Sequence, residues 1–318
     1  MPATSRAFEG PSDFELMERI VSESWRLAAP VVSCTVGDLE WWTINDPDQS
    51  LAGNARIWER DGRAVGWEWL DPPFAGDWHL QPGIDPASFL DPFLDRIEAA
   101  ARGADPAAGP TAETANPEAG ATASTKAWAM DADPAAIAVL TGRGYQPDGL
   151  ALSHWVRTLP VAGGDPVAEP PLPPGYRHAS VRWPDDVDRR VEAHRAAFAP
   201  SKMTREKYLG LIERPHYAPE RDRVVEAPDG SFVAFANGWW DPDGAVGELE
   251  PVGSHPDHRR LGLARAVCLR AIASLEAAGA RYVVINTGRA NLAAEALYES
   301  LGCVRVTTSR RYARPLPA

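Results

Sequence analysis

Cysteine is scarce in this chain, and its distribution excludes two kinds of site. The three cysteines, Cys34, Cys268 and Cys303, are far apart in a sequence of 318 residues. They have neither the paired spacing of a disulfide framework nor the spacing of a zinc-binding motif. Unpaired thiols are typical of a reducing compartment, so we expect a cytoplasmic protein.

Long apolar runs and excess positive charge are also lacking. No run approaches the length that crosses a membrane, and the N-terminal stretch MPATSRAFEGPSDFELMERI lacks the apolar core of a signal peptide. The net charge of −12 opposes nucleic acid or an anionic membrane as the main partner. What remains is a globular chain, 44% hydrophobic, whose 318 residues are enough for two domains.

Two segments are expected to lack regular structure. Residues 99–126 are a low-complexity stretch of Ala, Gly, Pro and Thr, which is typical of a mobile loop. Residues 160–175 are rich in Pro and Gly and indicate a linker. The predicted domains are therefore residues 1–159 and 176–318.

The two halves resemble one another at an offset of roughly 170 residues. In chain order, the matching pairs are WRLAAP (25–30) and HRAAFAP (194–200), ERDGRAVGW (59–67) and APDGSFVAF (227–235), WLDPPFAGDWHLQP (69–82) and WWDPDGAVGELEP (239–251), and GRGYQ (142–146) and SLGCV (300–304). We interpret the order as a duplicated α+β unit: helices first, then a hairpin meander, then strand–helix–strand–helix–strand.

The second copy contains a loop, HPDHRRLGLA (255–264), between a predicted strand at 245–252 and a predicted helix at 263–278. Apolar residues at helical spacing support this helix, and Gly279 is a suitable C-terminal stop. The free N–H groups at a helix start form an anion site, which Gly262 leaves accessible and which Arg259 and Arg260 complement. The first copy has only GIDP (83–86) at this place.

Arg259-x-x-Gly262-x-Ala264 resembles the pyrophosphate loop, R/Q-x-x-G-x-G/A, of the GNAT superfamily of acyl-CoA-dependent N-acyltransferases. Residues 291–302 (NLAAEALYESLG) are similar to that superfamily's N-x-x-A-x-x-L-Y-x-x-x-G segment. The resemblance covers residues 176 to about 314 directly and the first half only through the repeat. It implies an α+β fold with two GNAT-like domains in tandem, each a central mixed, mostly antiparallel sheet flanked by helices.

The resemblance also implies an acyl-CoA site in the second domain. Backbone N–H groups of the loop would hold the pyrophosphate, and the preceding strand end would hydrogen-bond the pantetheine arm. Asn291 is expected to reach the pantetheine arm, to cap its helix, or both. The full set of predicted cofactor-binding residues is Val252, Gly253, Ser254, Arg259, Arg260, Leu261, Gly262, Leu263, Ala264, Arg265, Asn286, Asn291 and Tyr298.

Three side chains are candidates for proton transfer. Tyr298, in the L-Y-x-x-x-G setting, is the predicted general acid that protonates the leaving thiolate, and Leu140 stands at its place in the first copy. Glu248, with Glu250 second, is the predicted general base on the strand before the loop, unless both are merely exposed carboxylates. These differences predict that the first domain does not catalyse.

The acceptor side of the site is less clear in the sequence. Phe198, Met203, Trp239 and Trp240 are candidates for an acceptor pocket, with core packing an equal alternative. Nine of the twelve tryptophans lie in the first half, which indicates a domain interface or a ligand platform there. No metal site is predicted, because His255 and His258 lack a third ligand.

The predicted function is an acetyl-CoA-dependent (or other acyl-CoA-dependent) N-acetyltransferase, in which a small-molecule primary amine attacks the thioester directly in a ternary complex. Two alternatives stay open. One is a protein that binds CoA or acyl-CoA without turnover or serves as an interaction protein. The other is an acetyltransferase acting on a protein amine. The sequence does not distinguish a monomer from a homodimer.

Overall fold

The structure, a computed structural model, describes residues 3–45, 50–72, 74–103, 124–160 and 171–316. The first copy of the repeat contains β1 (Thr4–Ala7), α1 (Pro11–Ala28), α2 (Val36–Asn45), α3 (Leu51–Asn54), β2 (Ala55–Arg60), β3 (Arg63–Asp71), β4 (Ala75–Leu80), α4 (Ala87–Gly103), β5 (Ser124–Met130), α5 (Pro134–Gly142) and β6 (Gln146–Thr158). The second contains β7 (Arg177–Ser180), α6 (Val187–Ala197), α7 (Arg205–Ile212), η1 (Pro219–Arg221), β8 (Asp222–Glu226), β9 (Phe232–Asp241), β10 (Val246–Ser254), η2 (Pro256–His258), α8 (Leu263–Ala278), β11 (Tyr282–Gly288), α9 (Leu292–Ser300) and β12 (Val304–Pro315).

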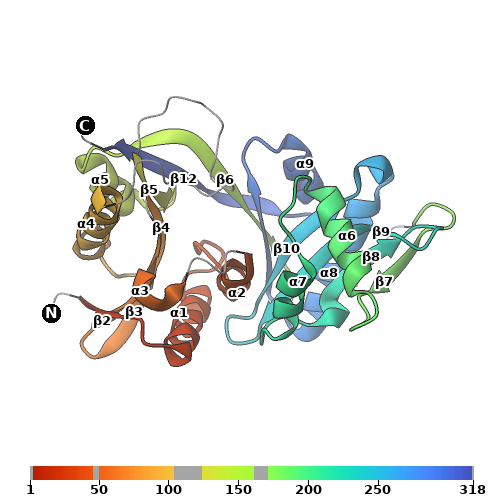
Figure 1. Ribbon diagram of the computed structural model, residues 1–318, viewed down its shortest axis with the longest axis horizontal. Coiled ribbons are helices and arrows are strands. Elements are labelled where there is room, and N and C mark those ends of the chain that lie inside the picture. The colour runs from red at the N-terminus through yellow and green to blue at the C-terminus, as the bar shows by residue number, and fades with distance from the viewer. Residues whose placement is uncertain (1–2, 46–49, 73, 104–123, 161–170, 317–318) are drawn as a thin grey trace.

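All twelve of these strands belong to one mixed sheet, in the order β1-β2-β3-β4-β5-β12-β6-β11-β10-β9-β8-β7. Neighbouring strands are antiparallel except at two places, β4 with β5 and β10 with β11, where the pairing is parallel. The expected fold of two mixed, mostly antiparallel units is therefore confirmed, with the difference that the two sheets join into one (Figure 1).

The join is an exchange of the last strand of each copy. β6 ends the first copy but pairs with β11 of the second copy. β12 ends the second copy and lies between β5 and β6, pairing with both. In Figure 1 the C-terminus therefore lies beside α5, on the same half of the molecule as the N-terminus. The bounds 1–159 and 176–318 separate the copies along the chain but do not divide the sheet.

Helices cover both faces of the second copy's sheet. Successive residues of a strand point to opposite sides, so neighbouring residues of one strand pack against helices on different faces. Val225 and Val233 pack in a cluster with the apolar side of α8. Their neighbours Val224 and Phe232 pack in another cluster with α6 and α7, which Trp41 of the first half joins. The halves thus share a core as well as a sheet. Among the described residues, no helix combines the length and hydrophobicity that a membrane crossing requires.

Two expectations from the sequence need correction. Each copy begins with a short strand, β1 or β7, before its helices, and these edge strands were not predicted. The loop expected at 99–126 is shorter, because α4 continues to Gly103 and β5 begins at Ser124; residues 104–123 lie outside the described part. Residues 161–170 of the predicted linker also lie outside it.

Candidate functional site

The loop after β10 ends at an open helix N-terminus. Helix α8 spans Leu263–Ala278, as the sequence predicted, and Gly279 ends it with a left-handed φ of 104°. Gly262 is the N-cap residue, with φ 78°, a conformation that favours glycine. No atom lies within 4 Å of where its Cβ would be, so the backbone here is accessible.

The N–H groups of this turn have no acceptor within the helix. Ala266 donates to the carbonyl of Gly262 at 3.0 Å, which leaves the N–H groups of Leu263, Ala264 and Arg265 pointing outward. Among the residues that the structure describes, no side chain caps them, and the first turn contains no acid. Arg259, Arg260 and Leu261 are exposed. The turn therefore has the donors and the charge that an anionic group requires.

The strand before the loop is bulged, and it diverges from its parallel neighbour. The β9–β10 register shifts between Leu249 and Val252. The β10–β11 pairing covers only Val246–Glu248 with Tyr282–Val284 in the described residues. Beyond the shift, Val252–Ser254 pairs with β9 alone, so its other backbone edge can bind an extended chain. A Cβ on Gly253 would collide with the ring of Phe235, which explains the glycine.

Glu248 is buried where the two halves meet. The residue is 2% exposed, and its carboxylate accepts a hydrogen bond from the hydroxyl of Thr35, which belongs to the first half. Burial, and then the neighbouring Asp38 carboxylate, raise the pKa of Glu248 well above its ordinary value. A carboxylate with a raised pKa can take a proton near neutral pH.

Glu250 occupies the bulge itself. Its backbone carbonyl accepts hydrogen bonds from Asn237 at 3.0 Å and from the indole of Trp239 at 2.7 Å, which fix the bulged backbone. Its side chain contributes to the wall of a large cavity. Both predicted bases therefore lie where β10 leaves its parallel pairing.

Tyr298 lies on α9 and is 5% exposed, packed in the same cluster as Cys268 and Cys303. Burial, and then Cys268, raise the pKa of its phenol, which therefore carries a proton at neutral pH. Its carbonyl accepts from Cys303 N at 3.2 Å, and the carbonyl of Leu140 accepts from Tyr145 N at 3.0 Å. The matching hydrogen bonds show that Leu140 replaces the phenol in the first copy.

The two predicted asparagines have different surroundings. Asn291 caps α9, its side chain accepting from Ala294 N at 3.2 Å, so the capping role is confirmed. Asn286 lies on β11 and contributes to the cavity wall. Its side-chain oxygen is buried without a hydrogen-bond partner, which identifies it as an acceptor available to a ligand.

The cavity has a volume of about 930 Å³ and reaches from the first half to Glu250 and Asn286 of the second. Six tryptophans line it: Trp41, Trp42, Trp67, Trp69, Trp78 and Trp128. The ionisable side chains that line it are mostly acidic, and no lysine or arginine occurs among the described lining residues. Burial, and then Asp71, raise the pKa of Asp77 in this wall to about 7. The sequence feature that indicated a domain interface or ligand platform here was the excess of tryptophan in the first half.

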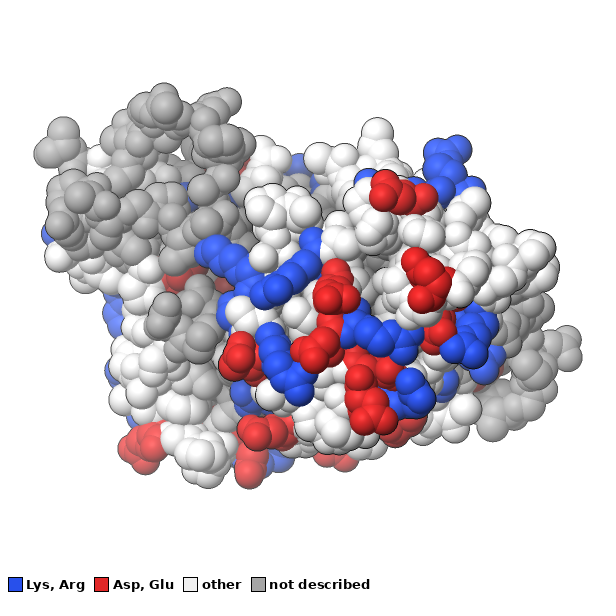
Figure 2. Space-filling view, turned by 45° about the vertical axis from the view of Figure 1, so that its right-hand side comes forward, with Lys and Arg blue, Asp and Glu red and all other residues white. Residues whose placement is uncertain are grey.

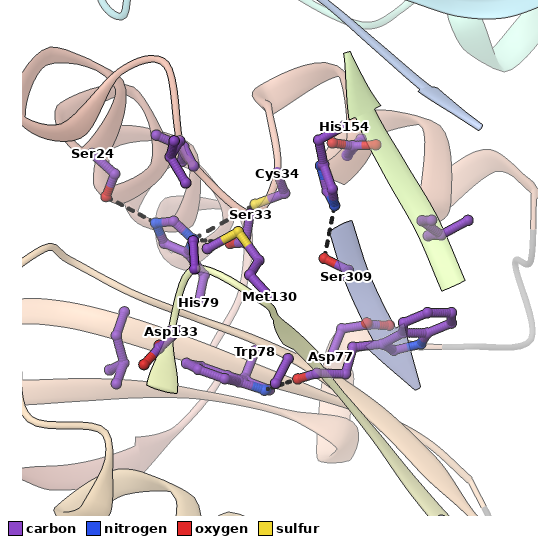
Figure 3. A pocket seen from close by; sticks show the side chains of 18 of the residues that line it. Ser24, Ser33, Cys34, Asp77, Trp78, His79, Met130, Asp133, His154 and Ser309 are labelled. Atoms are coloured by element: carbon purple, nitrogen blue, oxygen red, sulfur yellow. Dashed lines mark hydrogen bonds between the residues drawn. The ribbon is translucent and has the colours of Figure 1, made fainter. Parts of the chain in front are cut away.

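A hydrogen-bonded histidine lies in the same wall (Figure 3). The hydroxyl of Ser24 donates to the Ile20 carbonyl at 2.9 Å, so it accepts from Nε2 of His79 at 2.8 Å. Nδ1 of His79 then accepts from the Ser33 hydroxyl at 2.7 Å. Burial lowers the pKa of His79 to about 4, so the ring is neutral. The wall thus presents a fixed, uncharged polar group.

The β-ladders correct one alignment between the copies. By sequence, His79 stands at the place of Glu248, because the prolines after each strand align. In the structure, Glu248 pairs with Trp239, and the equivalent Trp69 pairs with Asp77. The extra bulge residues in β10 cause the difference, since β4 has no such register shift. The first copy therefore retains a carboxylate, that of the half-buried Asp77, at this position.

The side chains predicted for the acceptor pocket do not line the cavity. Met203 and Trp239 are buried in a core cluster shared with α6 and α7. Trp240 packs against the cluster around α8. Phe198 is 43% exposed.

The two histidines of the loop form hydrogen bonds within the chain. On the face that Figure 2 presents, basic and acidic side chains are interleaved. His258 Nδ1 hydrogen-bonds the Tyr176 hydroxyl at 2.9 Å, and His255 Nδ1 accepts from Asp257 N at 3.2 Å.

Comparison with known proteins agrees with this geometry. Residues 188–303 match the acetyltransferase (GNAT) family. The chain is 31% identical to a mycothiol acetyltransferase of Thermobispora bispora over 199 residues, 59% of this chain and 64% of the relative. It is 31% identical to that of Cellulomonas flavigena over 201 residues, 59% and 56% of the two chains. The matched regions span less than two thirds of either relative.

Solved structures resemble the whole chain. A GCN5-related N-acetyltransferase from Sphaerobacter thermophilus has a TM-score of 0.67 at 17% identity, covering 100% of this chain and 96% of its own. A tandem GNAT protein from the clavulanic acid biosynthesis pathway has a TM-score of 0.66 at 12% identity, covering 99% and 98%. Residues 188–303 therefore match the GNAT acetyltransferase family, and the whole chain shares the fold of a solved tandem GNAT protein.

Proposed function

We propose that the protein is an acetyl-CoA-dependent N-acetyltransferase that acetylates a primary amine of a small molecule. The observation that carries the proposal is the open N-terminus of α8 with Arg259 and Arg260, directly after a strand that diverges from its parallel neighbour. Catalysis belongs to the second copy, because the first has neither this loop nor a phenol at Leu140. The first copy supplies part of the surroundings of Glu248 and most of the cavity.

The residues present fit acetyl-CoA. The outward N–H groups of Leu263, Ala264 and Arg265, with the two arginines, suit a pyrophosphate. The free edge of Val252–Ser254 and the unpartnered oxygen of Asn286 suit the amides of a pantetheine arm. When bound, acetyl-CoA supplies the acetyl group activated as a thioester.

The protein's own part in the reaction is proton transfer. Glu248, through its Oε atoms, accepts a proton from the acceptor ammonium, directly or through water, with Glu250 as the second candidate. The Tyr298 hydroxyl donates a proton to the departing thiolate. Because burial and the Asp38 carboxylate raise the pKa of Glu248, kcat/KM should fall on acidification at a higher pH than for an ordinary glutamate.

The cavity suits the acceptor. Acidic walls favour a cationic amine, tryptophan faces pack against flat or ring-shaped groups, and the Ser33–His79 pair can hydrogen-bond a hydroxyl. The relatives named above are called mycothiol acetyltransferases, so an acceptor of the mycothiol class is the first to test. Direct attack in a ternary complex is proposed, because Cys34, Cys268 and Cys303 are all buried.

Binding is tested by calorimetric titration of acetyl-CoA into the whole protein. We expect one site, weakened about 10- to 100-fold by Arg259→Ala/Arg260→Ala, since charge-assisted hydrogen bonds to phosphate are worth about 1.5–3 kcal/mol. Arg270→Ala, on the same helix but beyond its first turns, is the matched control and should bind normally. Absence of binding would contradict the proposal, and two sites would contradict its restriction to the second copy.

Turnover is tested by following CoA thiol release with a panel of amines. Acetyl transfer to a small amine that depends on Tyr298 supports the proposed reaction. Tight acetyl-CoA binding without transfer to any amine would favour a non-catalytic acyl-CoA-binding protein. Transfer only to peptide or protein amines would favour a macromolecular acceptor.

A further inference from the structure

A second cluster of ionisable side chains lies away from the acyl-transfer site, where the halves pack together. Glu18 comes from α1, Glu40 from α2, and His216 from the segment between α7 and η1. One ligand atom from each of the three lies within 4.8 Å of the others. Nδ1 of His216 is 2.7 Å from Oε1 of Glu40 and 3.8 Å from Oε1 of Glu18. Three elements from both halves thus converge on one point.

The cluster has buried ligand atoms without partners. Glu40 is fully buried, and its Oε2 has no hydrogen-bond partner. Oε1 of Glu18, which is 9% exposed, has none either. A buried carboxylate oxygen is costly unless it is paired or coordinates a metal, so Oε2 of Glu40 in particular indicates a missing positive partner.

The surrounding charge favours a cation as well. Two carboxylates face one imidazole, and the buried Asp241 adds a third negative charge to the field at His216. Arg221 contributes a hydrogen bond to the His216 backbone carbonyl at 3.5 Å and a salt bridge to Glu220, rather than to the two ligand carboxylates. Within the described residues, the charge of the cluster is therefore not balanced by a lysine or arginine.

We propose that Glu18, Glu40 and His216 bind a divalent cation, with Zn²⁺ the best match, that joins the two halves of the chain. Zinc takes imidazole nitrogen and carboxylate oxygen at about 2.0–2.2 Å in tetrahedral geometry, which places ligand atoms about 3.3 Å apart. The observed separations bracket this value. Two carboxylates and a neutral imidazole would balance the charge of the ion, and a water molecule can complete its coordination.

The ion would hold α2 in place. Helix α2 carries Glu40 and also Gly37, whose Cα packs against Trp239 and the Glu248 carboxylate. A metal bond to His216 of the second half would fix this helix against β9 and β10. A fixed α2 would keep Glu248 in position for catalysis, and this consequence rests on the proposed function. The metal site itself does not rest on it, so the metal site and the proposed function can fail independently.

The test is calorimetric titration of Zn²⁺ into chelator-treated whole protein, together with the absorption spectrum of the Co²⁺-loaded protein. We expect one equivalent to bind, and the melting temperature to rise, because a ligand at 100 times its Kd stabilises by about 2.7 kcal/mol. Glu40→Gln and His216→Asn should each weaken binding at least tenfold. The matched control is His255→Asn/His258→Asn, which removes the half-buried histidine pair of the loop and should bind Zn²⁺ like wild type.

Three results would overturn the proposal: no saturable binding of one equivalent, binding that the control abolishes, or binding unchanged in both ligand variants. Should Glu40→Gln fail to fold, Glu18→Gln and the wild-type Co²⁺ spectrum still decide, since tetrahedral Co²⁺ absorbs far more strongly than the hydrated ion. Acetyl-CoA binding measured on the same samples tests the proposed function separately.

Discussion

At the scale of single residues, Tyr298 is the side chain that separates chemistry from binding. Tyr298→Phe keeps the buried ring in the cluster with Cys268 and Cys303 and removes only the hydroxyl. We expect kcat to fall about 10²- to 10⁴-fold, the usual contribution of a positioned acid, with unchanged calorimetric affinity for acetyl-CoA. Tyr312→Phe, at another buried tyrosine, is the control and should retain full kcat. Normal turnover in Tyr298→Phe would show that another group protonates the thiolate.

His154 gives a prediction for stability against pH. It is buried with Nε2 2.7 Å from the Ser309 hydroxyl, and burial lowers its pKa to about 4. The unfolded chain, with an ordinary histidine pKa of about 6.5, binds more protons between these values. The contribution of His154 to the free energy of unfolding is therefore fully present above pH 6.5 and is lost as the pH falls toward 4. This contribution is on the order of 3 kcal/mol at most. In urea unfolding at pH 7.5 and 4.5, His154→Gln should lose less stability on acidification than wild type; an equal loss would contradict this.

At the scale of elements, the contact between α2 and β10 can be tested through one glycine. A Cβ on Gly37 would lie 2.6 Å from Oε2 of Glu248 and 2.6 Å from the Trp239 ring. Gly37→Ala should therefore push α2 away and cost about 1–3 kcal/mol of unfolding free energy, as overpacking does. Gly142→Ala, in a helix with open space at its Cβ, should be neutral or stabilise by up to about 1 kcal/mol. Equal stabilities of the two variants would contradict the close packing.

Elements whose signals are local in sequence could be predicted. The helix from Leu263 to Ala278 was predicted to the residue, because Gly262 and Gly279 mark its ends and its apolar spacing is regular. The exposed turn before the helix was expected from the same glycine and its arginines, and its role in binding phosphate stays a prediction. The bulge at Glu250 was not found, since a bulge depends on pairing with β9. For this reason the sequence alignment of the two copies matched Glu248 to His79, whereas the strand pairing matches it to Asp77.

At the scale of the whole molecule, the exchange of β6 and β12 makes the halves dependent on each other. Separately expressed fragments 1–159 and 176–318 should each lack a strand neighbour and an intact core, and so should be largely unfolded by circular dichroism and proteolysis. Co-expression should restore a complex that binds acetyl-CoA. A cooperatively folded 176–318 fragment that binds acetyl-CoA with wild-type affinity would contradict this expectation.

The duplication and the tandem arrangement could be predicted at this scale, but neither the strand exchange nor the cavity could. Strand partners such as β12 and β5 are about 180 residues apart in the chain, and no local pattern specifies such a pairing. The six tryptophans of the cavity were noticed as an excess in the first half. Their convergence on Glu250 and Asn286 depends on how the halves pack, which is visible only in the fold.

The position of β12 also determines when the molecule can be completed during its synthesis. The ribosome makes the first half early, but the place between β5 and β6 is filled only by β12, which emerges after the other eleven described strands. Until then the nascent chain exposes strand edges on β5 and β6, which can pair with other chains. Removal of residues 304–315 would therefore disrupt the sheet of the first half, whose own sequence the deletion leaves intact.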